Sequence, residues 1–79
     1  AGSRKLVLRD ATSFPEELFE YQDQIEILDL AGCRLEKLPS NFPLLKRLRV
    51  AFFSRNPFSE VPAVLGECEN LEILGFKSC

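Results

Sequence analysis

Residues 25–39 read IEILDLAGCRLEKLP, and residues 48–62 read LRVAFFSRNPFSEVP. A shift of 23 positions places the apolar residues of one stretch on those of the other, and residues 71–79, LEILGFKSC, begin a third copy at the same interval. The matched sets are Ile25/Leu48/Leu71, Leu28/Ala51/Leu74, Leu30/Phe53/Phe76, Cys33/Asn56/Cys79, Leu35/Phe58, Leu38/Val61, Pro39/Pro62, Phe42/Leu65 and Leu45/Cys68. No set places a charged residue against an apolar one. A period of this length indicates stacked units, each unable to bury its apolar side alone.

The first unit is less regular than the others. Leu6 and Leu8 precede Leu28 and Leu30 by 22 positions, whereas Pro15 precedes Pro39 by 24. About two residues are therefore missing near residues 11–13, and one is extra before the next unit. Terminal units of repeat proteins are commonly atypical, because one of their sides meets solvent.

The two quoted stretches resemble the leucine-rich-repeat pattern LxxLxLxx(N/C)xLxxLP, with Ala51 and Phe53 departing from leucine. The resemblance implies an α/β solenoid with short parallel strands on a concave face and short helical or 3₁₀ turns on the convex side. We expect three to four repeats in a single domain over residues 1–79, near 3–24, 25–47, 48–70 and, incompletely, 71–79. Residues 48–56, with 64–68 and 75–79, further resemble bacterial leucine-rich-repeat proteins, some of which carry a protein-kinase domain.

Within each predicted strand, side chains alternate between the two faces of the sheet. Leu28 and Leu30 are expected to face the core, so Ile27 and Asp29 face outward, and the other repeats follow the same rule. The segments that lead from one strand back to the start of the next are called returns here. In these returns, Pro15 and Pro62 suit the first turn of a helix. We expect one or two helical turns after each proline.

Composition excludes several classes of protein. Ten basic and twelve acidic side chains give a net charge of −2, without the basic excess of nucleic-acid binders. No apolar run approaches the roughly 20 residues that span a bilayer, and the N-terminus lacks a signal-peptide core. Three cysteines, an odd number, argue against a disulfide framework. We expect a cytoplasmic protein that binds neither nucleic acid nor membrane, and residues 1–3 could be a cloning remnant.

Catalytic constellations are missing from the sequence. It has no histidine, and its four glycines are too scattered for a phosphate-binding loop. Glu16 and Glu17 are adjacent, and adjacent residues do not face each other on a helix. We predict no catalytic residue, no metal ligand and no cofactor for this fragment, and do not expect it to be an enzyme.

The cysteines are better explained by structure than by chemistry. Cys33 and Cys79 occupy the repeat position of Asn56, two strands apart and so separated by about 10 Å, too far for a disulfide. Cys68 lies on a return. Buried, unpaired thiols are favoured over a metal site or a redox switch, and Asn56 is expected to hydrogen-bond neighbouring turns inside the core.

The outward strand face is the candidate binding surface. Its columns read Ile27/Val50/Ile73, Asp29/Phe52/Gly75, Ala31/Ser54/Lys77 and Glu26/Arg49/Glu72. An outward phenylalanine among aliphatics, rimmed by charges, is typical of a protein-binding patch. The alternative is that the β-branched residues only pack along the sheet. The predicted partner-binding residues are Ile27, Asp29, Arg49, Val50, Phe52, Ile73 and Lys77.

We therefore predict a protein–protein interaction scaffold that binds a protein or peptide through its concave β-face. The alternative is a sensor or substrate-recognition region of a leucine-rich-repeat protein kinase in signalling, whose serine/threonine kinase domain would lie outside this chain. A structural spacer is a third possibility. Because nothing polar closes the core behind Leu74 and Phe76, further repeats or self-association are expected at that end.

Overall fold

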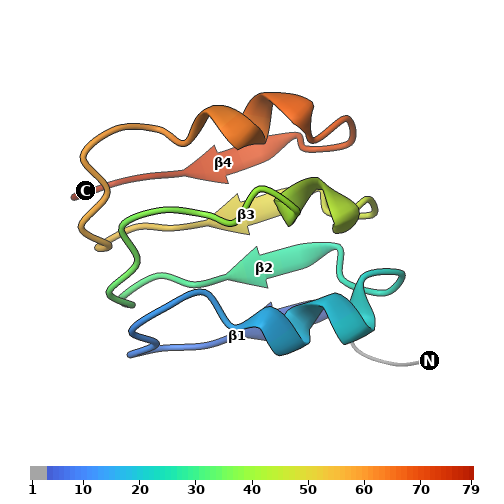
Figure 1. Ribbon diagram of the computed structural model, residues 1–79, viewed down its shortest axis with the longest axis horizontal. Helices are drawn as coiled ribbons and strands as arrows, with labels where there is room; N and C mark the ends of the chain where they lie inside the picture. The colour runs from blue at the N-terminus through green and yellow to red at the C-terminus, as the bar shows by residue number, and fades with distance from the viewer. Residues whose placement is uncertain (1–3) are drawn as a thin grey trace.

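The computed structural model describes residues 4–79, so the question of a cloning remnant at residues 1–3 lies outside it. It shows a small α/β arrangement of short strands alternating with 3₁₀ helices (Figure 1). The elements are β1 (Lys5–Val7), η1 (Glu16–Tyr21), β2 (Ile27–Asp29), η2 (Phe42–Leu44), β3 (Val50–Phe52), η3 (Ala63–Glu67) and β4 (Ile73–Gly75). None of these helices is long and apolar enough to cross a membrane.

The four strands form one parallel sheet in chain order, β1-β2-β3-β4. Leu28 pairs with Ala51 and Ala51 with Leu74, which confirms the predicted shift of 23 residues. Leu6 pairs with Leu28, which confirms the shift of 22 for the first unit. The helical segments succeed one another in the same order as the strands (Figure 1). A parallel pair needs a crossover connection, and each return supplies one.

The core lies between the sheet and the returns. Leu28 and Ala51 are fully buried, and each 3₁₀ helix adds one buried residue: Leu18, Phe42 and Leu65. The remaining members of the buried cluster are Ile25, Leu30, Cys33, Leu35, Leu38, Leu45, Leu48, Phe53 and Phe58. The inward positions predicted for the two central strands are therefore confirmed.

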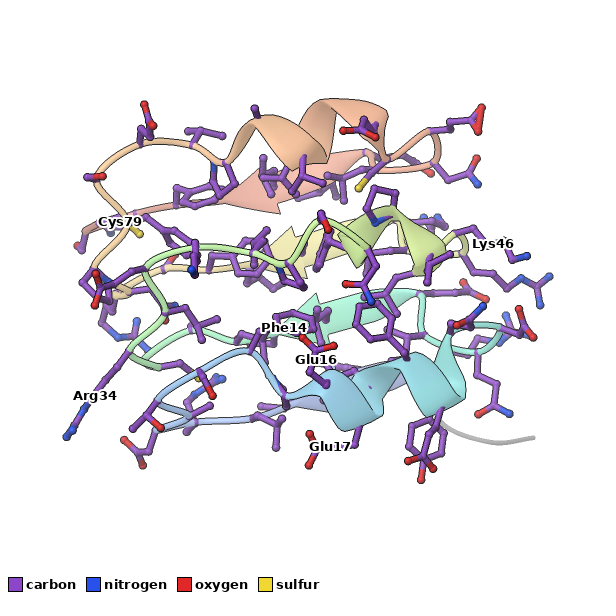
Figure 2. The ribbon with its side chains drawn as sticks, viewed as in Figure 1. Phe14, Glu16, Glu17, Arg34, Lys46 and Cys79 are labelled. Atoms are coloured by element: carbon purple, nitrogen blue, oxygen red, sulfur yellow. The ribbon has the colours of Figure 1, made fainter. Side chains whose placement is uncertain are left out.

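The returns begin as the prolines predict. Pro15 and Pro62 are extended residues directly before η1 and η3, so each helix starts one residue later. Figure 2 shows Glu16 and Glu17 leaving η1 on different sides, as expected for adjacent helical residues. The glutamates therefore do not combine into a site.

Asn56 is the one buried polar residue among residues 4–79. Its Oδ1 accepts the Leu35 N–H at 2.9 Å, and its Nδ2 donates to the carbonyls of Leu30 at 2.8 Å and Phe53 at 2.9 Å. A third, longer bond reaches the Ser54 carbonyl at 3.3 Å. The side chain therefore joins the turn after β2 to the turn after β3, which confirms its predicted structural role.

A left-handed residue follows every strand at the same repeat position. Asp10, Gly32, Arg55 and Ser78 have φ angles of 63°, 71°, 57° and 62°. Only Gly32 signals this conformation in the sequence, because a left-handed backbone costs a residue with a Cβ roughly 1–2 kcal/mol. The same left-handed turn thus occurs four times, and at three of these positions the residue has a side chain that disfavours the left-handed backbone.

Replacing Arg55 with glycine should raise the free energy of unfolding by about 0.5–1 kcal/mol, because relief of the left-handed strain exceeds the added entropy of the unfolded chain. Gly32→Ala, the matched control, should lower it by about 1 kcal/mol, although an added Cβ would meet only ordinary contacts, the nearest 3.5 Å away. Urea unfolding of both variants measures this. Destabilisation by Arg55→Gly would show that the arginine side chain outweighs its backbone cost.

Candidate protein-binding face

The side of the sheet turned away from the 3₁₀ helices is called the outer face here. It consists of the strand residues that alternate with the buried Leu28 and Ala51. Its members are Lys5, Val7, Ile27, Asp29, Val50, Phe52, Ile73 and Gly75. The sheet holds these side chains on a rigid backbone, so the face is preorganised for contact with a partner.

The centre of the outer face is apolar. Ile27, Val50 and Ile73 pair directly across neighbouring strands. Ile27 and Val50 are partly buried, whereas Ile73 is 53% exposed. Val7, at the other end of the face, is 46% exposed. The aliphatic residues therefore lie side by side along the sheet and also leave apolar surface in solvent.

Phe52 lies beside this aliphatic column and is partly buried. Its Cδ1 would be 3.1 Å from a Cβ placed on Gly75, so the ring covers the space that a side chain there would occupy. A glycine beside an outward phenylalanine could offer a notch for a partner side chain, but Gly75 does not, because the Phe52 ring fills that space. The remaining exposed part of Phe52 forms the aromatic element of the outer face.

A line of alternating charges borders the apolar centre. Arg4 contacts Glu26 at 3.2 Å, Glu26 contacts Arg49 at 3.7 Å, and Arg49 contacts Glu72 at 3.0 Å. The column Glu26, Arg49 and Glu72 thus forms a ladder of ion pairs that Arg4 extends. Such exposed pairs contribute little stability, but they occupy the guanidinium of Arg49, one of the predicted partner-binding residues.

Asp29 is held by a partner that the sequence did not reveal. Arg9 Nη1 and Nη2 donate to its two carboxylate oxygens at 2.9 and 3.1 Å, and the Ala31 N–H donates to Oδ1 at 3.0 Å. The Arg9 hydrogen bond is the main reason that the pKa of Asp29 lies below its usual value; the bond from Ala31 lowers it further. The same pair raises the pKa of Arg9. Asp29 is thus internally neutralised.

Replacing Asp29 with asparagine should destabilise the protein by up to about 1 kcal/mol at neutral pH, because exposure screens the Arg9 contact. The lowered folded-state pKa means that Asp29 stabilises the fold above its unfolded-state value of about 4, and that this contribution disappears as pH falls through the folded-state pKa. Urea unfolding at pH 7 and pH 2.5 should therefore show the two proteins converging in acid. An unchanged difference would exclude this source of stability.

The residues of the third predicted column, Ala31, Ser54 and Lys77, lie in different environments. Ala31 was expected to face outward, and that expectation is wrong, because the residue is only 6% exposed. Its neighbour on the next strand, Ser54, accepts the Lys77 N–H at 3.2 Å through Oγ. The Lys77 side chain is exposed and forms no ion pair within residues 4–79. Lys77 is therefore the one predicted charged site residue left without a charged partner.

The three thiols occupy different environments. Cys33 is buried, with Sγ 3.7 Å from the Leu8 carbonyl, whereas Cys79 is exposed, with Sγ 3.2 Å from the Phe53 carbonyl. The expectation that Cys79 is buried like Cys33 is wrong, because no further strand covers it within the described chain. Burial raises the pKa of the Cys68 thiol, and the nearby Glu67 raises it further.

Thiol titration under denaturing, non-reducing conditions should return three free thiols. In the native protein Cys79 should react first, Cys68 more slowly because less of it is thiolate, and Cys33 last because it must be uncovered. Mass spectrometry of the labelled protein gives the order. A Cys33–Cys79 bridge would overturn the strand register.

A recess of about 540 Å³ lies away from the outer face, between the first two returns. Phe14, Leu35 and Leu38 give it an apolar floor, while Glu16, Glu36, Arg34 and Lys37 line its opening. Figure 2 shows Arg34 extending away from the ribbon. The mixed signs favour no ligand charge, so the outer face remains the better candidate.

The described chain contains no group of three histidine, cysteine, aspartate or glutamate side chains that could hold a metal ion. No protein-family model matches the sequence, and a search of curated proteins finds no match.

Proposed function

We propose that the chain is part of a leucine-rich-repeat solenoid and that it is a protein-interaction scaffold, binding a protein or peptide through the outer face. The observation that carries the proposal is the partly exposed apolar centre formed by Ile27, Val50, Phe52 and Ile73 on a face opposite the core. Fixed strands support these side chains, and charged side chains surround them.

Three features support the solenoid part of the proposal. The strands pair in chain order with shifts of 22, 23 and 23 residues, and the left-handed turn recurs after every strand. Asn56 bonds the turns of two successive units, as the Asn/Cys position of the repeat requires. Each unit then contacts its neighbours only, and the sheet presents one continuous surface.

The composition of the outer face favours a protein ligand. Aromatic and aliphatic side chains at the centre with charges at the edge reproduce the core and rim of protein interfaces. A protein or peptide segment can bury the exposed Ile73 and Val7 together with Phe52. The paired charges of the ladder lie at the edge, and the neutralised Asp29 lies between Val7 and Phe52, so these charges add orientation rather than affinity.

The test uses peptides selected from a random 12-residue display library on the folded chain. Phe52→Ala should weaken binding of the selected peptides by about tenfold or more, as hot-spot truncations do. Tyr21→Ala is the matched control, because Tyr21 is an aromatic residue 49% exposed on η1. Unchanged binding by Phe52→Ala that remains folded by circular dichroism would refute the outer face as the binding site.

A further inference from the structure

Charge is unevenly distributed between the strand segments and the returns. Residues 4–10, 26–32, 49–55 and 72–78, which contain the strands and the turns that follow them, carry six basic and four acidic residues, whereas the rest of the chain carries four basic and eight acidic ones. The residues of the first group are Arg4, Lys5, Arg9, Arg49, Arg55, Lys77, Asp10, Glu26, Asp29 and Glu72. In a chain with a net charge of −2, the basic excess thus lies in the segments that carry the apolar patch.

Internal pairing then concentrates the available positive charge at one place. In the ladder, glutamates neutralise the charges of Arg4 and Arg49. The carboxylate of Asp29 neutralises the charge of Arg9. Arg55 and Lys77 form no ion pair within residues 4–79. Their backbones are joined, since the Arg55 N–H donates to the Lys77 carbonyl at 3.0 Å. The two residues therefore lie in neighbouring turns, beyond the carboxyl ends of β3 and β4.

This pair of cations directly follows the aromatic part of the face. Arg55 comes three residues after Phe52, and Lys77 comes two residues after Gly75, on which the Phe52 ring lies. The Arg55 guanidinium lies against Gly32, with Nη2 3.6 Å from where a Cβ would be, so the absent side chain leaves room for it. The order from one edge to the other is a neutralised ladder, an apolar centre and two unpaired cations.

Resting on the proposed function, we infer that the partner is an acidic protein segment. An apolar side chain of that segment packs on Val50 and Phe52, and aspartate or glutamate side chains immediately beyond it bind Arg55 and Lys77. Asp10, which forms no ion pair in the described chain, lies in the turn after β1, where its N–H donates to the Gly32 carbonyl at 3.2 Å, whereas Lys77 follows β4 at the other end of the sheet. Charge complementarity of this kind selects partners and speeds association.

The probes are three pools of fluorescein-labelled 12-residue peptides with a fixed central Leu-Phe pair. Their flanking positions are aspartate and glutamate in one pool, serine and asparagine in the second, and lysine in the third. Fluorescence anisotropy should show the acidic pool binding at least about tenfold more tightly than the neutral pool in low salt. The advantage should shrink as salt screens the cations, and the lysine pool should bind weakest.

The double variant Arg55→Asn, Lys77→Gln should erase the preference for the acidic pool, so that the acidic and neutral pools bind equally; a preference that persists would overturn the acidic partner. Asparagine tolerates the left-handed backbone of Arg55, so the turn is preserved. Arg34→Gln, Lys37→Gln, which removes two exposed cations that line the recess between the first two returns, is the matched control and should keep the preference.

The outcomes separate the two proposals. Equal binding of acidic and neutral pools, both weakened by Phe52→Ala, would overturn the acidic partner and leave the binding face intact. Binding unaffected by Phe52→Ala would overturn the binding face itself. Absence of binding by every pool at millimolar concentration would overturn both.

Discussion

Replacing Phe53 with alanine is expected to lower the free energy of unfolding by about 3–5 kcal/mol, the largest effect predicted here. Phe53 is fully buried, and its ring centroid lies 6.0 Å from that of Phe42, 5.8 Å from that of Phe58 and 5.3 Å from that of Phe76. Truncation removes these contacts and leaves a cavity between units. A chain of 79 residues has a total stability of only about 4–12 kcal/mol, so urea unfolding should show a much reduced or absent transition.

Two controls distinguish lost packing from general intolerance. Phe53→Leu preserves most of the volume and should cost about 1.5 kcal/mol or less. Phe52→Ala changes the adjacent, partly buried ring and should cost less than half as much as Phe53→Ala, because part of Phe52 is already solvated. A larger loss from Phe52→Ala than from Phe53→Ala would mean that the two faces of the sheet are assigned the wrong way round.

Replacing Asn56 with alanine should cost about 2–3 kcal/mol. The substitution leaves the Leu35 N–H and the Leu30 carbonyl without the partners that the amide provides at 2.9 and 2.8 Å inside the core. Unpaired buried backbone groups forfeit their full hydration, which makes the loss larger than the value of a typical hydrogen bond. Urea unfolding gives the free energy, and amide exchange by NMR should show faster exchange at Leu35.

Asn56→Cys is the informative comparison, because Cys33 occupies the same position one unit earlier. Its thiol makes one long contact, 3.7 Å to the Leu8 carbonyl, where Asn56 makes several. The cysteine variant should be intermediate in stability and should also lose protection at Leu35, since a thiol is a weak acceptor. Wild-type exchange at Leu35 in Asn56→Ala would show that the amide bond contributes no protection.

The 23-residue repeat explains why much of the fold could be predicted from the sequence. Leu28, Ala51 and Leu74 share a repeat position and pair across the sheet, because an apolar residue at a fixed interval can be buried only in one register. The 22-residue shift of β1 follows from the same constraint. Asn56 was also placed correctly, since a polar residue in an apolar column must satisfy its bonds internally.

The outer face of the sheet could be located from the sequence but not described in detail. Alternation placed Phe52 outward, whereas its ring orientation depends on Gly75 in the next strand. Arg9 binds Asp29, which lies 20 residues later in the sequence. This contact depends on side-chain rotamers, which a sequence pattern does not specify. Ala31 illustrates the same point, because it occupies an outward position in the pattern and is nevertheless buried.

The sequence by itself determined the strand register, the inward apolar positions and the place of Asn56, because all three follow from a period that burial enforces. The tertiary structure alone decided which charges are neutralised and which remain available. Ion pairs such as Arg9–Asp29 and the lack of one at Arg55 and Lys77 depend on side-chain reach between stacked strands. Left-handed turns at Asp10, Arg55 and Ser78 belong to the same class, since the stacking of units imposes a backbone that these residues do not prefer.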